Sequence, residues 1–345
     1  MKPGQLFGSN PRRETAREQD LTGLFALKPG LYVLILVCSV LGAFGYKLRN
    51  ESILACPADG YAGNQYLAYC HAVGYGDYDR GAFWFDLEPE AQRNAANAEV
   101  LFLGNSRMQF AFSTPATDNW LSSLGIRHYL LGFADFENAV FAGALLSKLR
   151  PRAKVYVINV DRFFDDHTRP PTKDVLYGAD TRTRYQQKQD WQFIHRSICT
   201  MLPMLCGNHI AFFRLRESGT WQLEGRSDTF GAKATVSEGP ARDSDRWKHY
   251  AVLGERFLSQ LPVDRQCVVL TLAPYVGTRR AEAEAIATAL SLDLVAPNLE
   301  GLQTFDTSHL DRASAERWAN GFFLAGGLRI RQCLDEAHMT SVTVP

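Results

Sequence analysis

The chain has 345 residues, and 46% of them are hydrophobic, so it is long enough for one large domain or two smaller ones. Lys and Arg together number 37, as do Asp and Glu, which gives a formal net charge of zero. This balance argues against nucleic acid as the main partner, because binding phosphates needs a concentrated basic surface.

An uncharged segment near the amino terminus predicts a membrane anchor. Residues 1–29 are mostly polar and predict a flexible cytoplasmic tail, whereas residues 30–46 carry no charge. As a helix the second segment spans about 26 Å at roughly 1.5 Å per residue, and the flanking Lys28 and Lys47 can snorkel to the interfaces. A cleaved signal peptide is the alternative, but its amino-terminal region would contain three acidic residues, which is untypical.

The distribution of basic residues predicts the orientation of this anchor. Five Lys or Arg residues precede the segment and only two closely follow it. By the positive-inside rule, the amino terminus is then cytoplasmic and the rest of the chain extracytoplasmic. We therefore expect a single-pass protein of the cell inner membrane with a periplasmic domain.

The cysteines fit an oxidising compartment. Cys38 lies inside the anchor, which leaves six cysteines for the exported part and permits three disulfides. The local pairs Cys56–Cys70 and Cys199–Cys206 are the first to expect. No cysteine pair has metal-ligand spacing with histidine, so the sequence predicts neither a metal nor a cofactor.

Residues 47–97 predict an extracytoplasmic linker and packing segment. Up to residue 86 it is rich in Tyr and Gly, contains Phe83-Trp84-Phe85, and shows no sustained period of helix or strand. Its aromatic residues either pack on the domain or line a sugar-binding surface, and packing is the commoner use. A short helix is expected at 89–98, because Pro89 suits a first helical turn.

From residue 99 onward, strand and helix patterns alternate. The expected strands are 99–103, 126–131, 154–160, 267–272 and 292–295. The expected helices are 114–124, 136–149, 278–290 and a last one that starts near 312 and runs to about 323, with a further segment to 334. Alternation of this kind predicts βαβ units and a parallel sheet.

Residues 165–250 interrupt this alternation and are expected to form an insertion. The insertion contains aromatic patches with helical spacing at 191–198 and 210–215, followed by a polar stretch at 217–245. A helix at 247–261 ends it.

A serine and a distant histidine form the main candidate site. The run Val100–Arg107 reads as a buried strand that opens into a tight turn at Gly-Asn-Ser, which puts the Ser106 hydroxyl at the carboxyl end of the strand. Asp306 and His309 follow the fifth expected strand and should lie at the same sheet edge. A serine becomes nucleophilic when a neutral imidazole accepts its proton and a carboxylate orients that imidazole. On its own, however, Gly-Asn-Ser is also ordinary turn chemistry.

Four motifs in this order resemble the SGNH (GDSL-type) hydrolase superfamily. They are Gly104-Asn-Ser106, Leu270-Thr-Leu-Ala-Pro274, Asp306-x-x-His309 and His309–Arg317, and the similarity covers residues 98–162 and 262–325. The resemblance implies a three-layer, doubly wound, flavodoxin-like α/β domain over residues 98–335. It also implies that Ser106 is the nucleophile, His309 the base and Asp306 the residue that orients it.

The remaining site residues are less typical of that family. Asn105 stands where the best-known members have Asp, although Gly-x-Ser-Arg resembles the membrane-anchored branch that acts in cell-envelope acylation. The resemblance implies an oxyanion hole made by the Ser106 N–H, Gly132 and an Asn side chain. Asn159 is the nearest candidate for that side chain, and alternatively it caps the end of its strand. Arg107 either binds an acidic group of the substrate or pairs with a structural Asp.

These features together lead to two expected functions. The first is a serine O-acyltransferase or carbohydrate esterase that acts on O-acyl groups, acetyl above all, of cell-envelope or exported polysaccharide through an acyl-serine. For a transferase, the resemblance implies a multispanning membrane acyltransferase as the partner that supplies the acyl group. The alternative is a non-catalytic, SGNH-like, polysaccharide-binding component of an export or assembly complex.

Overall fold

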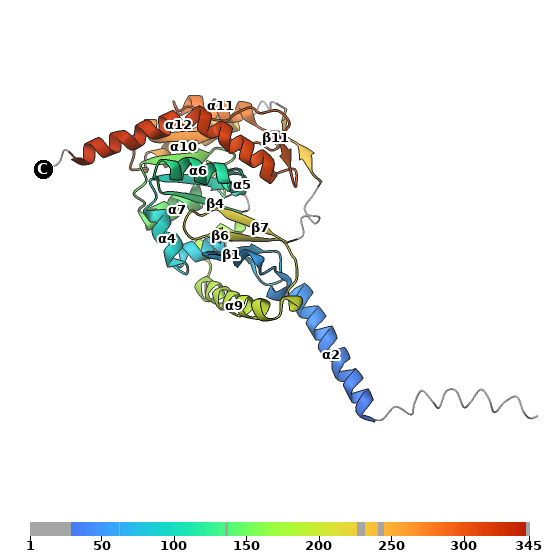
Figure 1. Ribbon diagram of the computed structural model, residues 1–345. Helices are drawn as coiled ribbons and strands as arrows, with labels where there is room; N and C mark the ends of the chain where they lie inside the picture. Colours follow the sequence, from blue (N-terminus) through green and yellow to red (C-terminus); the bar gives the residue numbers. More distant parts are fainter. Residues whose placement is uncertain (1–28, 62, 135–136, 226–231, 241–244, 343–345) are drawn as a thin grey trace, which may run out of the picture. The chain divides into compact units, whose positions relative to one another are not determined.

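The computed structural model describes residues 29–61, 63–134, 137–225, 232–240 and 245–342 of the chain (Figure 1). It has two units, residues 1–48 and 49–345, which are considered separately. Most of the predicted cytoplasmic tail lies outside the described residues.

The helix α2 (Pro29–Glu51) contains the predicted anchor. It is 23 residues long, and by its length and composition it can cross a membrane. Its only charged residues lie in the last five positions, so the stretch before Lys47 is continuously uncharged.

A parallel sheet of four strands is the centre of the second unit. The strands are β3 (Val100–Asn105), β4 (His128–Phe133), β5 (Val155–Asn159) and β10 (Val268–Thr271), in the spatial order β10-β5-β3-β4. All four are almost completely buried and apolar, as expected for strands that are covered on both faces. Because the strands are parallel, Asn105, Phe133 and Asn159 end them at one edge.

Alternate residues of these strands enter two separate cores. Leu101 and Leu103 of β3 belong to a cluster with side chains of α7, α10 and α11. Val100 and Phe102 belong to another cluster with side chains of α5, α6 and α12. The helices of the second unit around this sheet are α5 (Ser106–Phe112), α6 (Pro115–Ser123), α7 (Ala139–Leu149), α10 (Arg246–Leu258), α11 (Arg280–Ala289) and α12 (Arg312–Val342).

Two expectations for the carboxyl-terminal half need correction. Residues 292–295 do not form a fifth strand of the sheet, because they contribute only an isolated bridge between Leu294 and Leu270. The pairing stops there since Pro297, two residues after Val295, has no N–H to donate. The last helix and the further segment expected to 334 are one continuous helix, α12, which extends past both expected ends to Val342.

A second, antiparallel sheet replaces the irregular segment that the sequence predicts after the anchor. It consists of β1 (Gln65–Cys70), β2 (Gly76–Asp77), β6 (Ala211–Leu215) and β7 (Trp221–Glu224), in the order β2-β1-β6-β7. The expected helical patch at 210–215 is therefore wrong. It becomes a strand because β1 and β7 pair with both of its edges. Residues before the α/β segment and residues inside the insertion thus share one sheet.

Further described helices of this unit lie in the chain before β3 or inside the insertion. They are α3 (Asp79–Trp84), α4 (Pro89–Ala96), α8 (Pro170–Tyr177) and α9 (Thr181–Met201), with the 3₁₀ turns η1 (Ile53–Ala55), η2 (Asp59–Tyr61) and η3 (Pro203–Leu205). A further 3₁₀ turn, η5 (Arg265–Cys267), precedes β10. Four short strands form two pairs outside both sheets: β8 (Ala234–Thr235) with β12 (Gln303–Thr304), and β9 (Ser237–Glu238) with β11 (Val276–Thr278).

A fully buried arginine joins the antiparallel sheet to the parallel one. Arg214 of β6 donates from Nη2 and Nε to the Asp79 carboxylate at 2.6 and 3.0 Å, and from Nη1 to the carbonyl of Leu130 at 2.5 Å. It also donates to the carbonyl of Gly132 in β4. Tyr66 donates to the same carboxylate at 2.6 Å. The hydrogen bonds from Arg214 to these two carbonyls therefore fix β6 against β4, and the buried ion pair with Asp79 joins β6 to α3.

All six cysteines outside the anchor form disulfides. Both predicted local pairs, Cys56–Cys70 and Cys199–Cys206, are confirmed, and the third bond joins Cys267 to Cys333. Three disulfides indicate an oxidising, extracytoplasmic environment for this unit.

Removal of the third disulfide should destabilise the protein more than removal of the second. The Cys267–Cys333 bond closes a loop of 66 residues, whereas Cys199–Cys206 closes one of 7. We expect Cys267→Ser with Cys333→Ser to lower the free energy of unfolding by about 2–4 kcal/mol. Cys199→Ser with Cys206→Ser should lower the free energy of unfolding by less. Urea unfolding of both double variants would measure the two losses. Equal losses would contradict the loop-length explanation.

Candidate active site

Ser106 lies at the junction of β3 and α5, at the carboxyl edge of the parallel sheet. Asn105 is the N-cap of α5, and its Oδ1 accepts a hydrogen bond from the Arg107 N–H at 3.0 Å. The Asn105 amide donates to the carbonyl of Asp161 at 3.2 Å. The buried Asn105 therefore holds the turn in place and leaves the neighbouring Ser106 partly exposed at the start of α5.

Gly104 makes this turn possible through the close approach of its neighbours. A Cβ atom at this position would meet Met108 Cβ at 2.9 Å and Asn159 Cβ at 3.0 Å. Both contacts are with side-chain stems that cannot move without shifting their backbone. Glycine at the end of β3 is therefore a packing requirement for placing Ser106.

The structure brings Ser106, His309 and Asp306 into one hydrogen-bonded row. His309 Nε2 lies 2.8 Å from Ser106 Oγ, and His309 Nδ1 lies 2.6 Å from Asp306 Oδ2. With Nδ1 protonated toward a carboxylate, Nε2 is the atom that accepts the serine proton. This is the geometry that nucleophilic activation of a serine needs.

Hydrogen bonds within the loop that carries Asp306 and His309 hold it in a tight turn. Asp306 Oδ1 accepts from the N–H groups of Ser308 at 3.0 Å and His309 at 2.7 Å. The Phe305 N–H donates to the carbonyl of His309 at 3.0 Å. Thr307, at φ 67°, takes the left-handed conformation that this tight turn requires. The position of the carboxylate is thus fixed by backbone N–H groups as well as by its contact with the imidazole.

Hydrogen bonds hold the pKa of the Asp306 carboxyl below its ordinary value. Burial acts in the opposite direction and raises the pKa, but the bonds from the His309 side chain and from the two backbone N–H groups outweigh it. Asp306 therefore stays ionised, and able to orient His309, into moderately acidic solution.

This shift has a consequence for stability against pH. A carboxyl whose folded pKa is depressed stabilises the fold above its unfolded pKa of about 3.9 and loses that effect as the pH falls through the folded value. We expect Asp306→Asn to lower the free energy of unfolding at neutral pH, and the difference from wild type to shrink toward pH ~3. Urea unfolding of the variant and of the wild type, at neutral pH and at pH ~3, would measure this difference. A difference that does not change with pH would count against the ionised carboxylate.

Aromatic rings enclose the imidazole on two sides. The ring centroid of Phe110 lies 4.9 Å from that of His309, and Phe305 stacks on His309 at 5.6 Å. Phe110 also meets Trp221 of β7 edge-on at 5.6 Å. The antiparallel sheet, and with it the insertion, therefore packs against Phe110, the ring that contacts the imidazole.

Arg107 lies beside the triad but is engaged within the protein. Its guanidinium contacts the Asp161 carboxylate, donates from Nε to Ser308 Oγ at 3.0 Å, and lies 3.6 Å above the ring of Tyr275. Its side chain is 11% exposed. Of the two roles that the sequence allows for Arg107, these contacts fit the pairing with a structural Asp. Through Ser308, Arg107 helps to position the loop of His309.

The two other expected oxyanion donors are also engaged elsewhere. The Gly132 N–H donates to Gln109 Oε1 at 3.1 Å. Asn159 is fully buried, accepts from the Ala273 N–H at 2.9 Å and donates to Asn105 Oδ1 at 3.4 Å. In this conformation neither presents an N–H to a substrate, whereas the Ser106 N–H lies in the first turn of α5, where backbone donors lack helical acceptors.

Gln109 is a residue beside the site that the sequence motifs do not select. It is fully buried one turn after Ser106, and its Nε2 donates to the carbonyl of Gly219 at 2.5 Å while its Oε1 accepts from Gly132. A polar residue in the otherwise apolar run Met108–Phe112 is the signal that marks it.

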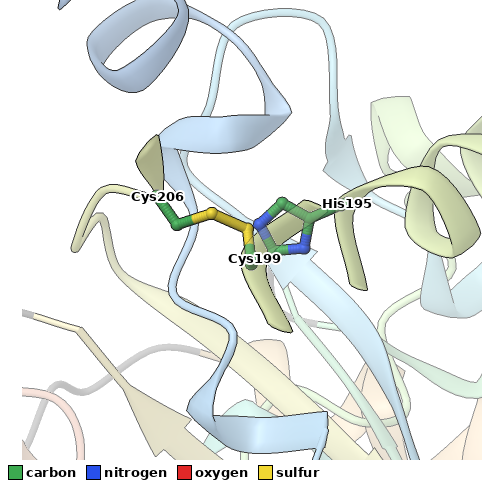
Figure 2. A group of neighbouring side chains, drawn as sticks. All are labelled: His195, Cys199 and Cys206. Carbon is green, nitrogen blue, oxygen red and sulfur yellow. A yellow bond between two sulfur atoms is a disulfide. The ribbon is translucent and has the colours of Figure 1, made fainter. Parts of the chain in front are cut away.

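Figure 2 shows a second cluster, His195 with Cys199 and Cys206, whose potential ligand atoms lie within 4.8 Å of one another. The two sulfur atoms are bonded to each other, so neither is a thiolate. The ring nitrogens of His195 contact Tyr61 Oη at 3.0 Å and the carbonyl of Cys56 at 3.1 Å. With the disulfide closed, the donor set does not suit a metal ion, and these residues instead fix α9 to the residues after the anchor.

Comparisons of the chain with protein-family models, with curated proteins and with solved structures found no match. The geometry of the described residues therefore carries the functional inference.

Proposed function

We propose that this protein is a membrane-anchored serine acyltransferase or esterase of SGNH type. The row Ser106–His309–Asp306 carries the proposal, because its members come from opposite ends of the domain and still meet at 2.8 and 2.6 Å. A structural role alone would not require a serine hydroxyl aligned with an imidazole that is held by a carboxylate.

The proposed reaction proceeds through an acyl-serine. Ser106 Oγ attacks the carbonyl carbon of an ester while His309 Nε2 takes its proton, and Asp306 holds the imidazole in position. The alcohol leaves with the proton from His309, so the acyl group stays on Ser106. In the second half, an acceptor hydroxyl loses its proton to His309 and attacks the acyl carbon. The bond from that carbon to Ser106 Oγ then breaks, and His309 returns the proton to the serine oxygen. The acceptor is a sugar in a transferase and water in an esterase.

The proposed fold is a three-layer, doubly wound, flavodoxin-like domain. In chain order the four strands lie as 2-1-3-4, which matches the flavodoxin-like arrangement as far as the sheet extends. The cores on both faces and the position of Ser106 at the carboxyl edge support the same arrangement.

The proposed location is the inner membrane, with the amino terminus in the cytoplasm and the site outside it. The apolar helix and the three disulfides support the extracytoplasmic part, and the bias of basic residues supports the orientation. Such a site acts on cell-envelope or exported polysaccharide, with acetyl as the expected acyl group. If it transfers, a multispanning membrane acyltransferase supplies that group.

The second candidate function is a non-catalytic, polysaccharide-binding component of an export or assembly complex. The engagement of the Gly132 N–H with Gln109 and of the Asn159 amide with Asn105 favours it, because loss of one oxyanion donor lowers a rate on the order of 10²–10³-fold.

Labelling with a fluorophosphonate separates the two functions. We expect the wild-type protein to form a covalent adduct and Ser106→Ala to form none, because the probe needs an activated serine hydroxyl. Ser147→Ala, which removes an exposed helix serine bonded to the Gly143 carbonyl, is the matched control and should label like wild type. No adduct on wild type, or an adduct that survives Ser106→Ala, would overturn the catalytic proposal.

Acceptor dependence then separates transferase from esterase. With an activated acetyl ester as donor, a transferase releases the leaving group faster when an oligosaccharide acceptor is added, and the oligosaccharide gains the acetyl group. Release at the same rate with water alone would establish the esterase.

A further inference from the structure

The helix α9 exposes an apolar stripe on the side that faces away from the protein. Trp191, Ile194, Ile198 and Met201 follow one another at spacings of three, four and three residues, so they lie along one side of the helix. Trp191 is 52% exposed, Ile194 41% and Met201 71%.

The inward side of the same helix is unusually polar. Gln192 exchanges hydrogen bonds with the backbone of Leu67 at 3.0 and 3.1 Å, and His195 bonds to Tyr61 and to the carbonyl of Cys56. The inward side thus pairs polar groups beside the buried Tyr185 and Cys199, whereas a surface helix usually faces the protein with an apolar stripe. The contacts on the inward side hold the apolar stripe in a fixed orientation.

The exposed apolar surface continues into the turn after the helix. Leu202 is 48% exposed and Met204 of η3 is 75% exposed. The Cys199–Cys206 disulfide closes this turn onto the last turn of α9 (Figure 2). The continuous surface, here called the α9 patch, comprises Trp191, Ile194, Ile198, Met201, Leu202 and Met204, none of which is charged.

The α9 patch is tethered close to the point where the chain leaves the anchor. The Gly207 N–H donates to the carbonyl of Leu54 at 2.5 Å, and the His209 N–H donates to that of Ala55 at 2.9 Å. A Cβ atom on Gly207 would meet the Arg49 carbonyl oxygen at 2.7 Å, so these backbones are in contact. In the sequence, Arg49 comes only three residues after the uncharged segment 30–46.

We infer that the α9 patch lies on the surface of the lipid bilayer that the anchor enters. The short tether keeps the patch near that surface, and a large exposed apolar area that includes Trp is typical of a membrane interface. The proposed catalytic reaction plays no part in this inference. The patch gives the extracytoplasmic unit a second attachment to the membrane, which restricts how the unit can turn on its anchor.

A fluorescent label tests the contact in the full chain reconstituted in phosphatidylcholine nanodiscs. Cys38→Ala removes the free thiol, and Trp191→Cys then carries a nitrobenzoxadiazole label. Interfacial helices bury their apolar face by about 5–10 Å, so bromine atoms on the shallow acyl carbons should quench this label. We expect a blue-shifted emission and quenching by brominated lipid. Leu324→Cys on α12, at a side chain that is 90% exposed, is the matched control and should show neither.

A second pair of variants shows whether the stripe itself makes the contact. Ile194→Asp with Met201→Asp places charges at exposed positions, so the fold should survive, which thermal unfolding in detergent would verify. The label at 191 should then lose its blue shift and its quenching, whereas Leu324→Asp with Leu328→Asp should leave both unchanged. If, without the Asp substitutions, the label at 191 showed no more blue shift and no more quenching by brominated lipid than the label at 324, the inference would be overturned. The α9 patch would then bind a protein partner.

Discussion

Replacing His309 by Ala is expected to lower the turnover of an activated acetyl ester by roughly 10⁴- to 10⁶-fold. His309 is the base in contact with Ser106 Oγ, and no other imidazole among the described residues contacts that oxygen. Steady-state rates with a chromogenic acetyl ester would measure the loss.

The three members of the row should act as one unit. We expect the double variant Ser106→Ala with His309→Ala to be no slower than either single variant, because the same transition-state interaction is lost each time. His249→Ala, which removes a half-exposed imidazole that lies 3.4 Å from Asp166, is the control and should retain full activity. If His309→Ala kept more than about a tenth of the rate, triad catalysis would not explain the activity.

Replacing Arg214 by Met should destabilise the fold by about 3–5 kcal/mol, because the change leaves the Asp79 carboxylate buried without its partner. It also removes the donors to the carbonyls of Leu130 and Gly132, and hence the link between the two sheets. Urea unfolding would measure the loss.

Two further variants separate the charge effect from the loss of packing. Adding Asp79→Leu to Arg214→Met removes the orphaned carboxylate, so part of the stability should return. Arg265→Met breaks the exposed pair with Glu255 and should cost no more than about 1 kcal/mol. Equal losses for Arg214→Met and Arg265→Met would show that the buried pair has no special role.

Much of the parallel sheet can be predicted from the sequence, because its signals are local. The β-branched and apolar runs at β3, β5 and β10 are buried on both faces, and each is followed by a helix with its own period. Ser106 can be selected for the same reason, since it follows a strand whose end is marked in the sequence. Asp306 and His309 can be selected only from their residue types and spacing, because the fifth strand that they were expected to follow does not form.

The antiparallel sheet could not be predicted in this way. Residues 211–215 have apolar spacing that suits a helix, and they become a strand only because β1 and β7, which the sequence does not reveal as partners, lie on either side. Pairing between segments so distant in the chain leaves no local pattern.

The prediction of the oxyanion donors fails for a related reason. A sequence shows that Gly132 and Asn159 lie at the ends of strands at the correct edge. It does not show that Gln109 Oε1 already accepts from the Gly132 N–H, or that Asn105 Oδ1 accepts from the Asn159 amide. Which partner a buried polar group finds depends on packing in three dimensions.

The pairing of β1 with β6 also sets the order in which the unit can fold. A ribosome makes β1 first, and Arg214, which pairs with Tyr66 of β1, follows only after β3, β4 and β5 are complete. Until then β1 is a strand with an open edge, which is prone to pair with another chain. The Cys56–Cys70 disulfide can close before β6 exists and hold the end of β1 against the η1 turn. We therefore expect this disulfide to matter more for the yield of folded protein during synthesis than for the stability of the finished fold.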